Sequence, residues 1–494
     1  MLALDVRPAI AQELNRSIGA ENVSTDLAAL RSYSRDYSLV AGTCPDFIVY
    51  PRSKKDVREI VRIANQHEVS LVPVSSGPPR FHGDTLPSKR GIVVDFGRMR
   101  QIVKIDSVSR CATVEPGVTY GEIVPALESH GMKVNMPLAP RANKSVLTSC
   151  LEREATLIPK YQYDYMDPLL TLEVIYGSGD EFRTGSASGP GTSESLKADK
   201  VNPWGPGAID YYRLLSASQG TIGLVTRGVI RTEVRPALRK LYFIPLDNPQ
   251  QLAAPLDALL RKRVVDECLA LNSTNLATLL ADDARADFAP LKAALPPWTI
   301  IACVAGYQRR AEERVSIHEK YLIEICATLG LQTLTRLPGA PGLETDVVRV
   351  ISEPWSKEPY WKLRRTDRCY EIFFLAPLSK AGYFVESMKE VVERSRCPGL
   401  DYGVYVQPLV QGRGAHCAFL LPCDGSSAEE VEAVQELFLS ASETLMKKGA
   451  FFSRPYGPWA PMVYRNYADG AAMLRTLKNI FDPNGILNPG KLCF

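Results

Sequence analysis

Apolar residues recur at two different spacings in the first part of the chain, and the two spacings alternate. Helical spacing of Val57, Ile60, Val61 and Ala64 predicts a helix over 54–66. A second amphipathic pattern, which ends at Gly131, predicts a helix over 120–130. Short apolar runs typical of strands cover 46–51, 71–74, 92–96 and 111–119. This alternation of short strands and helices predicts an α/β arrangement.

The next block reads as strands joined by turns. Runs 169–176 and 181–183 are separated by Gly-Ser-Gly-Asp, which predicts a hairpin. Gly, Ser and Pro dominate 185–206 and predict a loop, and a β-branched run over 222–234 predicts a long strand.

From about Arg239 the pattern changes to strand-then-helix units. Segments 404–410 and 417–422 predict an antiparallel pair, and the last segment predicts a helix followed by the turn-rich tail DPNGILNPGKLCF. The strand-then-helix units are 241–246 with 249–263, 300–305 with 309–329, and 370–375 with 382–394. This middle part predicts an α+β sheet with helices on one face.

Composition narrows the class of protein. The chain has 494 residues, of which 45% are apolar and 23% charged, the balance of a globular protein. Its net charge is +3, from 58 basic and 55 acidic residues, which gives no reason to expect a nucleic-acid or membrane-surface partner. No apolar run approaches the roughly 18 residues of a membrane span, and the first residues lack the pattern of a signal peptide.

The eleven cysteines are scattered, and no Cys-x-x-Cys pair occurs. This spacing signals neither a zinc nor an iron–sulfur site, so we expect no metal. Scattered thiols in a long chain favour reduced cysteines and a cytoplasmic protein.

Two loops have the small residues that let backbone N–H groups approach a phosphate. The first, PVSSGPPRFHGDTLP at 73–87, follows a predicted strand and matches neither a nicotinamide-type Rossmann motif nor a P-loop. The second, QGTIGLVT at 219–226, runs directly into a predicted strand. Either one alone also fits an ordinary surface loop or turn.

Four stretches together resemble the flavoproteins of the vanillyl-alcohol oxidase and p-cresol methylhydroxylase superfamily. They are PDFIVYPRSKKDVREIV, PVSSGPPRFHGDTLP, YYRLLSASQGTIGLVTRGVI and IFDPNGILNPGKLCF, and their order and spacing match over essentially the whole chain. The resemblance implies an FAD-dependent enzyme with an α+β, two-domain fold. An FAD-binding domain over 1–238 would be interrupted by an antiparallel-sheet cap domain over 239–451, and 452–494 would return to the FAD-binding domain.

The resemblance also implies which residues meet the cofactor. The pyrophosphate would lie against 75–78, where Ser-Ser-Gly replaces the family's three glycines, and Lys491 would close the site. Pro116 and Gly117 would flank the flavin, and the 220–225 segment would approach the adenine and ribose. The full implied set is Pro73, Ser75, Ser76, Gly77, Pro78, His82, Gly83, Asp84, Pro116, Gly117, Gly220, Thr221, Gly223, Val225 and Lys491.

The implied catalytic residues are Asp164, Arg454, His82 and His416. Asp164 matches the family's carboxylate beside the flavin if two residues are inserted, and otherwise it caps a turn. Arg454 matches an arginine that binds the substrate's phenolate, or it forms a surface ion pair. His82 and Ser453 replace tyrosines of the family, so a different polar or anionic aromatic substrate is open. His82 and His416 could instead be structural histidines.

The implied activity is removal of hydride from a small aromatic substrate, a benzylic alcohol or alkylphenol, with electrons passed to oxygen, a cytochrome or another redox protein. Two alternatives stay open. One is a D-2-hydroxy-acid dehydrogenase; such enzymes commonly have a His-rich metal motif, and the matching segment QGRGAHCAF has only one histidine. The other is a non-catalytic flavoprotein subunit of a redox complex. FAD would be bound non-covalently or through Tyr370 or His82. Homo-oligomers are a family expectation.

Overall fold

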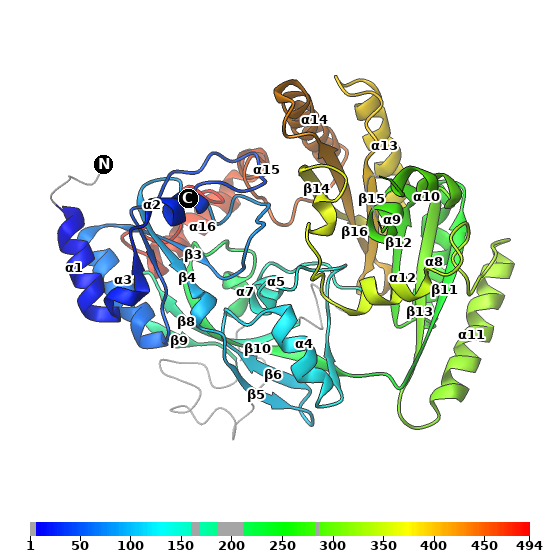
Figure 1. Ribbon diagram of the computed structural model, residues 1–494, viewed down its shortest axis with the longest axis horizontal. Helices are drawn as coiled ribbons and strands as arrows, with labels where there is room; N and C mark the ends of the chain where they lie inside the picture. The colour runs from blue at the N-terminus through cyan, green and yellow to red at the C-terminus, as the bar shows by residue number, and fades with distance from the viewer. Residues whose placement is uncertain (1–5, 160–167, 186–210, 283–285) are drawn as a thin grey trace.

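Three β-sheets organise the described residues, 6–159, 168–185, 211–282 and 286–494, of this computed structural model (Figure 1). The first sheet has the order β1-β2-β4-β3, in which β2, β4 and β3 are parallel. Its strands are β1 Val23–Ser24, β2 Phe47–Val49, β3 Ser70–Val74 and β4 Gly91–Asp95. The helices around it are α1 Val6–Ile18, α2 Leu27–Ser32 and α3 Lys54–His67. The predicted α/β pattern is therefore confirmed, with α3 between two parallel strands.

The second sheet is antiparallel and is built around the long strand β10, Gly223–Val234. Its order is β5-β6-β10-β8-β9, and β7 also pairs with β10. The predicted hairpin is confirmed as β8 paired with β9. The other strands are β5 Ile102–Asp106, β6 Cys111–Val114, β7 Met132–Val134, β8 Leu169–Tyr176 and β9 Glu181–Arg183. The helices nearby are α4 Tyr120–Glu128, α5 Val146–Leu151 and α7 Tyr212–Leu215.

The third sheet, which we call the cap sheet, has six antiparallel strands in the order β11-β13-β12-β15-β16-β14. The predicted pair 404–410 and 417–422 is confirmed as β15 with β16. The strands are β11 Leu238–Leu246, β12 Glu267–Asn272, β13 Trp298–Gly306, β14 Arg368–Pro377, β15 Gly403–Leu409 and β16 Gly414–Cys423. The helices are α8 Ala253–Arg261, α9 Ser273–Leu280, α10 Phe288–Ala294, α11 Ala311–Thr328, α12 Glu344–Ser352, α13 Ala381–Glu393 and α14 Ala428–Lys447.

The last part of the chain returns to the first sheet. Helix α16, Ala468–Phe481, lies near β3 in Figure 1, whereas helix α15, Trp459–Arg465, borders the cap part, where its Trp459 stacks on Phe438 of α14. Beyond α16, the backbone of Leu487 forms a parallel bridge with Leu71 of β3. The chain thus leaves the first two sheets, builds the cap sheet and comes back to β3. The division into domains, with boundaries at 239 and 452, remains a prediction.

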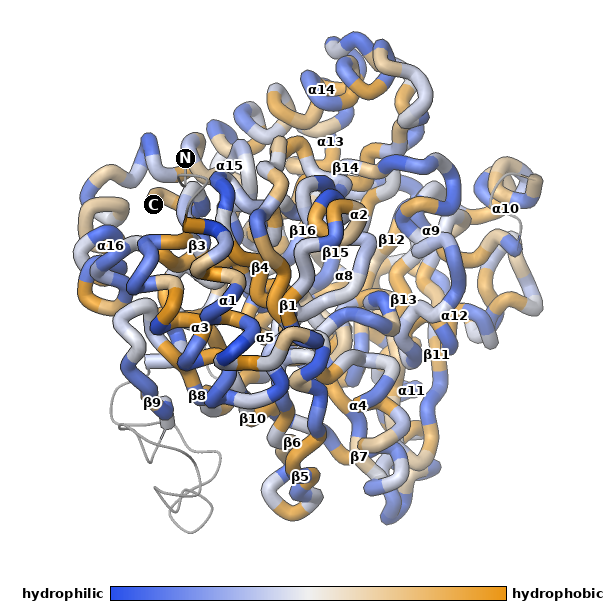
Figure 2. Tube along the Cα trace, turned by 60° about the vertical axis from the view of Figure 1, so that its left-hand side comes forward, coloured by the Kyte–Doolittle hydropathy of each residue, from blue (hydrophilic) through white to orange (hydrophobic). Residues whose placement is uncertain are grey.

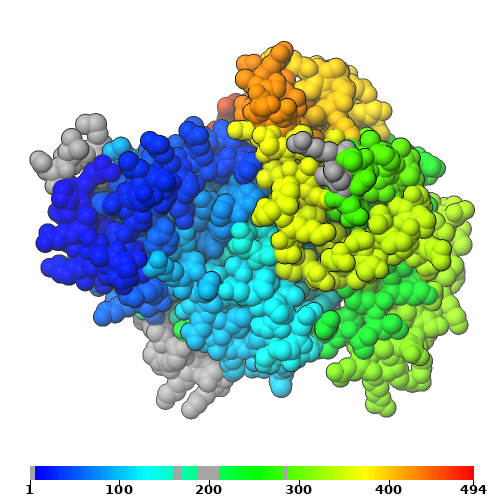
Figure 3. Space-filling view, in the orientation of Figure 1, coloured from blue at the N-terminus to red at the C-terminus, as the bar shows by residue number. Residues whose placement is uncertain are grey.

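Buried apolar residues form a separate core for each part. Figure 2 shows apolar β3 and β4 inside a shell of polar helix faces, because side chains on the buried strands point into the core on both sides. The cap sheet has the largest core, between its strands and helices α8, α11, α13 and α14. In the space-filling view the amino-terminal and cap parts meet along an extended boundary (Figure 3). Their joint includes paired backbone of Ala142 and Trp355, with the Ala142 N–H 2.8 Å from the Trp355 carbonyl.

Candidate functional site

A cavity lies between the amino-terminal sheets and the cap sheet, and most of the residues expected at the cofactor line it. The lining includes Pro73, Ser75, Ser76, His82, Asp84, Pro116, Gly220, Gly223 and Val225. It also includes Arg454 and His416, so segments far apart in sequence converge there. Of the other expected cofactor residues, Gly77, Pro78, Gly83, Gly117, Thr221 and Lys491 lie around this lining and do not form it.

The loop after β3 carries serine hydroxyls at positions where the resembling family has glycines. The hydroxyls of Ser75 and Thr148, which both line the cavity, are hydrogen-bonded to each other. The Ser145 N–H donates to the Ser76 hydroxyl at 3.1 Å, and the Gly77 N–H donates to the Asn143 carbonyl at 3.2 Å. The loop is therefore fixed against the start of α5 and presents hydroxyls to the cavity.

Glycine is required where the second loop passes β3. Gly220 has φ +70°, and a Cβ there would lie 2.3 Å from Cγ of Pro73. Only a residue without a side chain lets the 219–225 segment lie this close to the cavity floor.

The C-terminal tail holds both loops in place. The Asn488 amide donates to the Asp84 carbonyl at 2.9 Å and to the Gln219 carbonyl at 2.7 Å. Lys491 Nζ donates to the Gly83 carbonyl at 2.8 Å, so this residue acts from behind the loop. Buried Lys478 of α16 donates to the Thr221 carbonyl at 2.8 Å and pairs with Asp482 at 2.5 Å.

Aromatic side chains form the opposite end of the cavity. The Arg454 guanidinium lies 4.2 Å from the centre of the Phe373 ring, and the side chain is only 5% exposed. His82 stacks on Tyr456 with ring centres 4.5 Å apart and ring planes inclined by 13°. His416 lies 5.8 Å from Phe373 on the neighbouring strand.

Both histidines are neutral in this setting. Burial is the largest cause that lowers the pKa of His82 well below 6.5, and Lys144, Arg454 and Lys362 add to it. The pKa of His416 falls well below 6.5 for the same reasons, burial first and then Arg454 and Lys362. A neutral imidazole can both donate and accept a hydrogen bond, whereas neither ring is suited to hold an extra proton.

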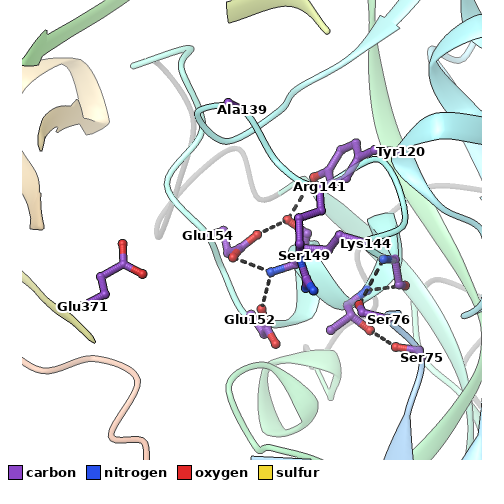
Figure 4. A network of polar contacts seen from close by, with 12 residues as sticks. Ser75, Ser76, Tyr120, Ala139, Arg141, Lys144, Ser149, Glu152, Glu154 and Glu371 are labelled. Carbon is purple, nitrogen blue, oxygen red and sulfur yellow. Dashed lines mark hydrogen bonds and ion pairs between the residues drawn. The ribbon is translucent and has the colours of Figure 1, made fainter. Parts of the chain in front are cut away.

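A buried charge cluster lines the cavity at the end of α5, and sequence reasoning missed it (Figure 4). Lys144 Nζ lies 3.0 Å from Glu152 and 2.5 Å from Glu154. The Ser149 hydroxyl donates to Glu154 at 2.5 Å and accepts from Tyr120 at 2.9 Å. Burial opposes ionisation of Glu154, but Lys144 and then Arg454 outweigh it and lower its pKa to about 2. Glu154 is therefore a fixed negative charge.

A second ion pair lies on the cap side, where Glu371 appears apart from this cluster in Figure 4. Lys362 Nζ is 2.6 Å from Glu371, and both residues line the cavity. Neither pair has a local spacing signal, because each partner is placed by the tertiary fold. The alternation of β14 could have indicated that Glu371 and Phe373 share one face.

Asp164, an expected catalytic residue, lies outside the described residues. Tyr370 is on β14, but its hydroxyl accepts from the Gln435 amide of α14 at 2.9 Å. Because successive strand residues point to opposite faces, Tyr370 faces α14 while Glu371 and Phe373 face the cavity. Tyr370 is therefore not among the residues that line the cavity, and flavin attachment through it stays a prediction.

Comparison with known proteins agrees with this geometry. Residues 45–150 match the family model described as FAD binding domain, and 459–492 match FAD linked oxidases, C-terminal domain. The fold superposes on p-cresol methylhydroxylase with substrate bound with a TM-score of 0.83, at 18% identity, covering 100% of this chain and 98% of that chain. The chain therefore carries an FAD binding domain and the C-terminal segment of FAD linked oxidases, and it has the fold of p-cresol methylhydroxylase.

Two relatives span the same length. Glycolate oxidase subunit GlcD of Bacillus subtilis (strain 168) is 23% identical over 100% of this chain and 97% of its own. The 4-cresol dehydrogenase [hydroxylating] flavoprotein subunit of Pseudomonas putida is also 23% identical, over 97% of this chain and 94% of its own. The FAD-linked oxidoreductase described here is an enzyme, and its cofactor is FAD.

The cavity residues fit this cofactor. Ser75, Ser76 and Thr148 supply hydroxyl donors, and the glycine at 220 leaves room for a close backbone approach. At the other end the walls are aromatic, which suits a flat ring system. Among the described residues no helix is long and apolar enough to span a membrane, and no group of three His, Cys, Asp or Glu side chains could hold a metal ion.

Proposed function

We propose that this enzyme oxidises a small aromatic substrate that carries an anionic oxygen, such as a benzylic alcohol with a phenol group on its ring or an alkylphenol bound as the phenolate. The observation that carries the proposal is buried Arg454, laid over Phe373 at the aromatic end of the cavity. A planar cation beside aromatic walls can bind a phenolate or carboxylate through a fork of N–H groups while the walls pack the ring.

The other residues at this end orient the substrate and keep out water. His82 and His416 are neutral, so either ring can donate to or accept from a substrate oxygen. Tyr456 and Phe373 fill the space around them. FAD, when bound, supplies the hydride acceptor. A role for Asp164 as base or charge partner rests on the family resemblance alone.

A second candidate is oxidation of a D-2-hydroxy acid. It is favoured by the full-length similarity to a glycolate oxidase subunit, and Arg454 could equally bind a carboxylate. We place it second because the aromatic lining offers packing that a small aliphatic acid does not use.

Anaerobic reduction of the purified FAD enzyme separates these candidates. Flavin absorbance would be followed with 4-hydroxybenzyl alcohol, a 4-alkylphenol, glycolate and D-lactate. Bleaching by the aromatic compounds supports the proposal. Bleaching by the hydroxy acids alone rejects it in favour of the second candidate.

We propose further that FAD is held without a covalent bond, since Tyr370 faces α14. Acid precipitation should leave the flavin in the supernatant, and flavin in the pellet would point to attachment at His82, which lines the cavity.

Electrons would pass to a separate acceptor, which fits the similarity to a protein named as a flavoprotein subunit.

We also propose that the protein forms a homo-oligomer and is located in the cytoplasm. The location is supported by eleven cysteines that are all free thiols.

A further inference from the structure

Asp84 stands out among the charged groups of the cavity because its backbone is fixed while its side chain lines the cavity. The preceding Gly83 N–H donates to the Asp36 carboxylate at 2.7 Å, and Lys491 Nζ donates to the Gly83 carbonyl at 2.8 Å. Asn488 donates to the Asp84 carbonyl at 2.9 Å. Three contacts from two other segments thus fix the backbone of Gly83 and Asp84, and Asp84 is one of the residues that line the cavity.

Burial and two neighbouring carboxylates favour the protonated form of Asp84. The groups that face it are Glu152 after α5, Asp36 from the loop before β2, Lys491 from the C-terminal tail and Tyr456, whose hydroxyl pKa is raised by burial and in part by Asp84. Burial is the largest cause that raises the pKa of Asp84 to about 7, followed by the charges of Glu152 and Asp36. Lys491 opposes this shift without cancelling it.

Two other candidate bases in the cavity, His82 and Glu154, are less suited to take a proton. Three cations surround His82, so an additional positive charge on its ring is disfavoured. Glu154 is held ionised by Lys144 at 2.5 Å, which makes it a weak base. A general base works best when its pKa is close to the working pH, and only Asp84 among these groups meets that condition.

We propose that Asp84 is the proton acceptor in the oxidation of an alcohol at this site. The inference rests on the proposed function. As the substrate O–H bond breaks, its proton passes to the Asp84 carboxylate and the C=O bond forms. The C–H bond breaks at the same carbon, and its electron pair leaves as hydride to the enzyme's oxidant, FAD. The substrate loses two electrons and two hydrogens, one as hydride and one as the proton on Asp84.

The test is stopped-flow reduction of the FAD enzyme by 4-hydroxybenzyl alcohol as a function of pH. A base acts in its deprotonated form, so the wild-type rate constant should rise as pH increases through about 7. In Asp84→Asn the rate constant should fall roughly 100-fold and lose this ionisation. Asp257→Asn, on the surface of α8, is the matched control and should behave like wild type. An Asp84→Asn enzyme with an unchanged rate and pH profile would overturn the proposal.

Two further measurements keep the result independent of folding and of the substrate assignment. Formate should restore reduction in Asp84→Ala that retains FAD, and a lack of recovery counts against the proposal. In infrared difference spectra, a protonated-carboxyl band that titrates near pH 7 should be present in wild type and absent from Asp84→Asn; no such band would overturn the charge assignment. If no alcohol reduces the wild-type flavin, the proposed function fails, whereas the infrared titration still tests Asp84.

Discussion

Arg454 is the residue on which recognition of an anionic substrate should depend. Arg454→Met removes the cation, and we expect the rate constant for flavin reduction by 4-hydroxybenzyl alcohol to fall roughly 100-fold. Arg454→Lys keeps the charge but loses the planar fork and the contact with Phe373, so its loss should be smaller but clear. Rapid-mixing kinetics measure both.

The internal control is the substrate and not a second protein. Benzyl alcohol has the same ring and reacting carbon but no anionic oxygen, so its reduction rate should change little in either variant. Equal losses for the two alcohols would show that Arg454 holds the site together and does not recognise the phenolate.

Local sequence could indicate some site residues and not others. The loop containing Ser75, Ser76 and His82 was found because small residues directly after an apolar strand form a local signal. The pairs Lys144–Glu154 and Lys362–Glu371 could not be found in this way. Lysine and glutamate at such spacings are ordinary on any exposed surface, and only the tertiary fold buries them.

The C-terminal tail, residues 482–494, is the element that connects the two cofactor loops. Asn488 alone donates to a carbonyl in each loop, at 2.9 Å to Asp84 and 2.7 Å to Gln219. Asn488→Ala should therefore weaken FAD binding, with a dissociation constant about 10-fold higher if the two hydrogen bonds together contribute roughly 1.5 kcal/mol. Recovery of flavin fluorescence on dissociation provides the measurement.

Asn484→Ala offers the matched comparison in the same tail. Its amide donates to the half-buried side chain of Asn65 at 2.9 Å, and it has no hydrogen bond to either loop among the described residues. FAD affinity in this variant should equal that of wild type. If both variants lose the same affinity, the tail contributes through general stability and not through Asn488.

Elements with local signals were predicted well, and their arrangement was not. Helix α3 and the hairpin β8–β9 follow directly from apolar spacing and turn residues. No prediction was made for β12 or for the twenty-residue helix α14. The strand order β11-β13-β12-β15-β16-β14 pairs segments as far apart in sequence as Ala270 and Val406, which periodicity within a short window does not encode.

At the scale of the whole molecule, one buried carboxylate joins the amino-terminal sheets to the cap sheet. Glu267 of β12 is 6% exposed. It lies 2.7 Å from Lys133 of β7 and is also paired with Arg239 of β11, which contacts Ser352 of α12. Burial opposes its ionisation, but Lys133 and Arg239 outweigh it and lower the pKa of Glu267 to about 2.

Removing this charge should loosen the whole structure, because two cations from different sheets would remain partly buried without their shared partner. For Glu267→Gln we expect the free energy of unfolding to drop by about 3 kcal/mol at neutral pH, measured by urea denaturation. Since the folded pKa is lower than the unfolded value of 4.5, the stabilisation is complete above that value and is lost as pH falls toward about 2. The difference between wild type and variant should therefore shrink over this acid range.

Glu313→Gln, which breaks the exposed pair with Arg310, should change stability by less than about 1 kcal/mol at any pH. Equal effects of the two substitutions would mean that Glu267 does not join the two parts of the molecule.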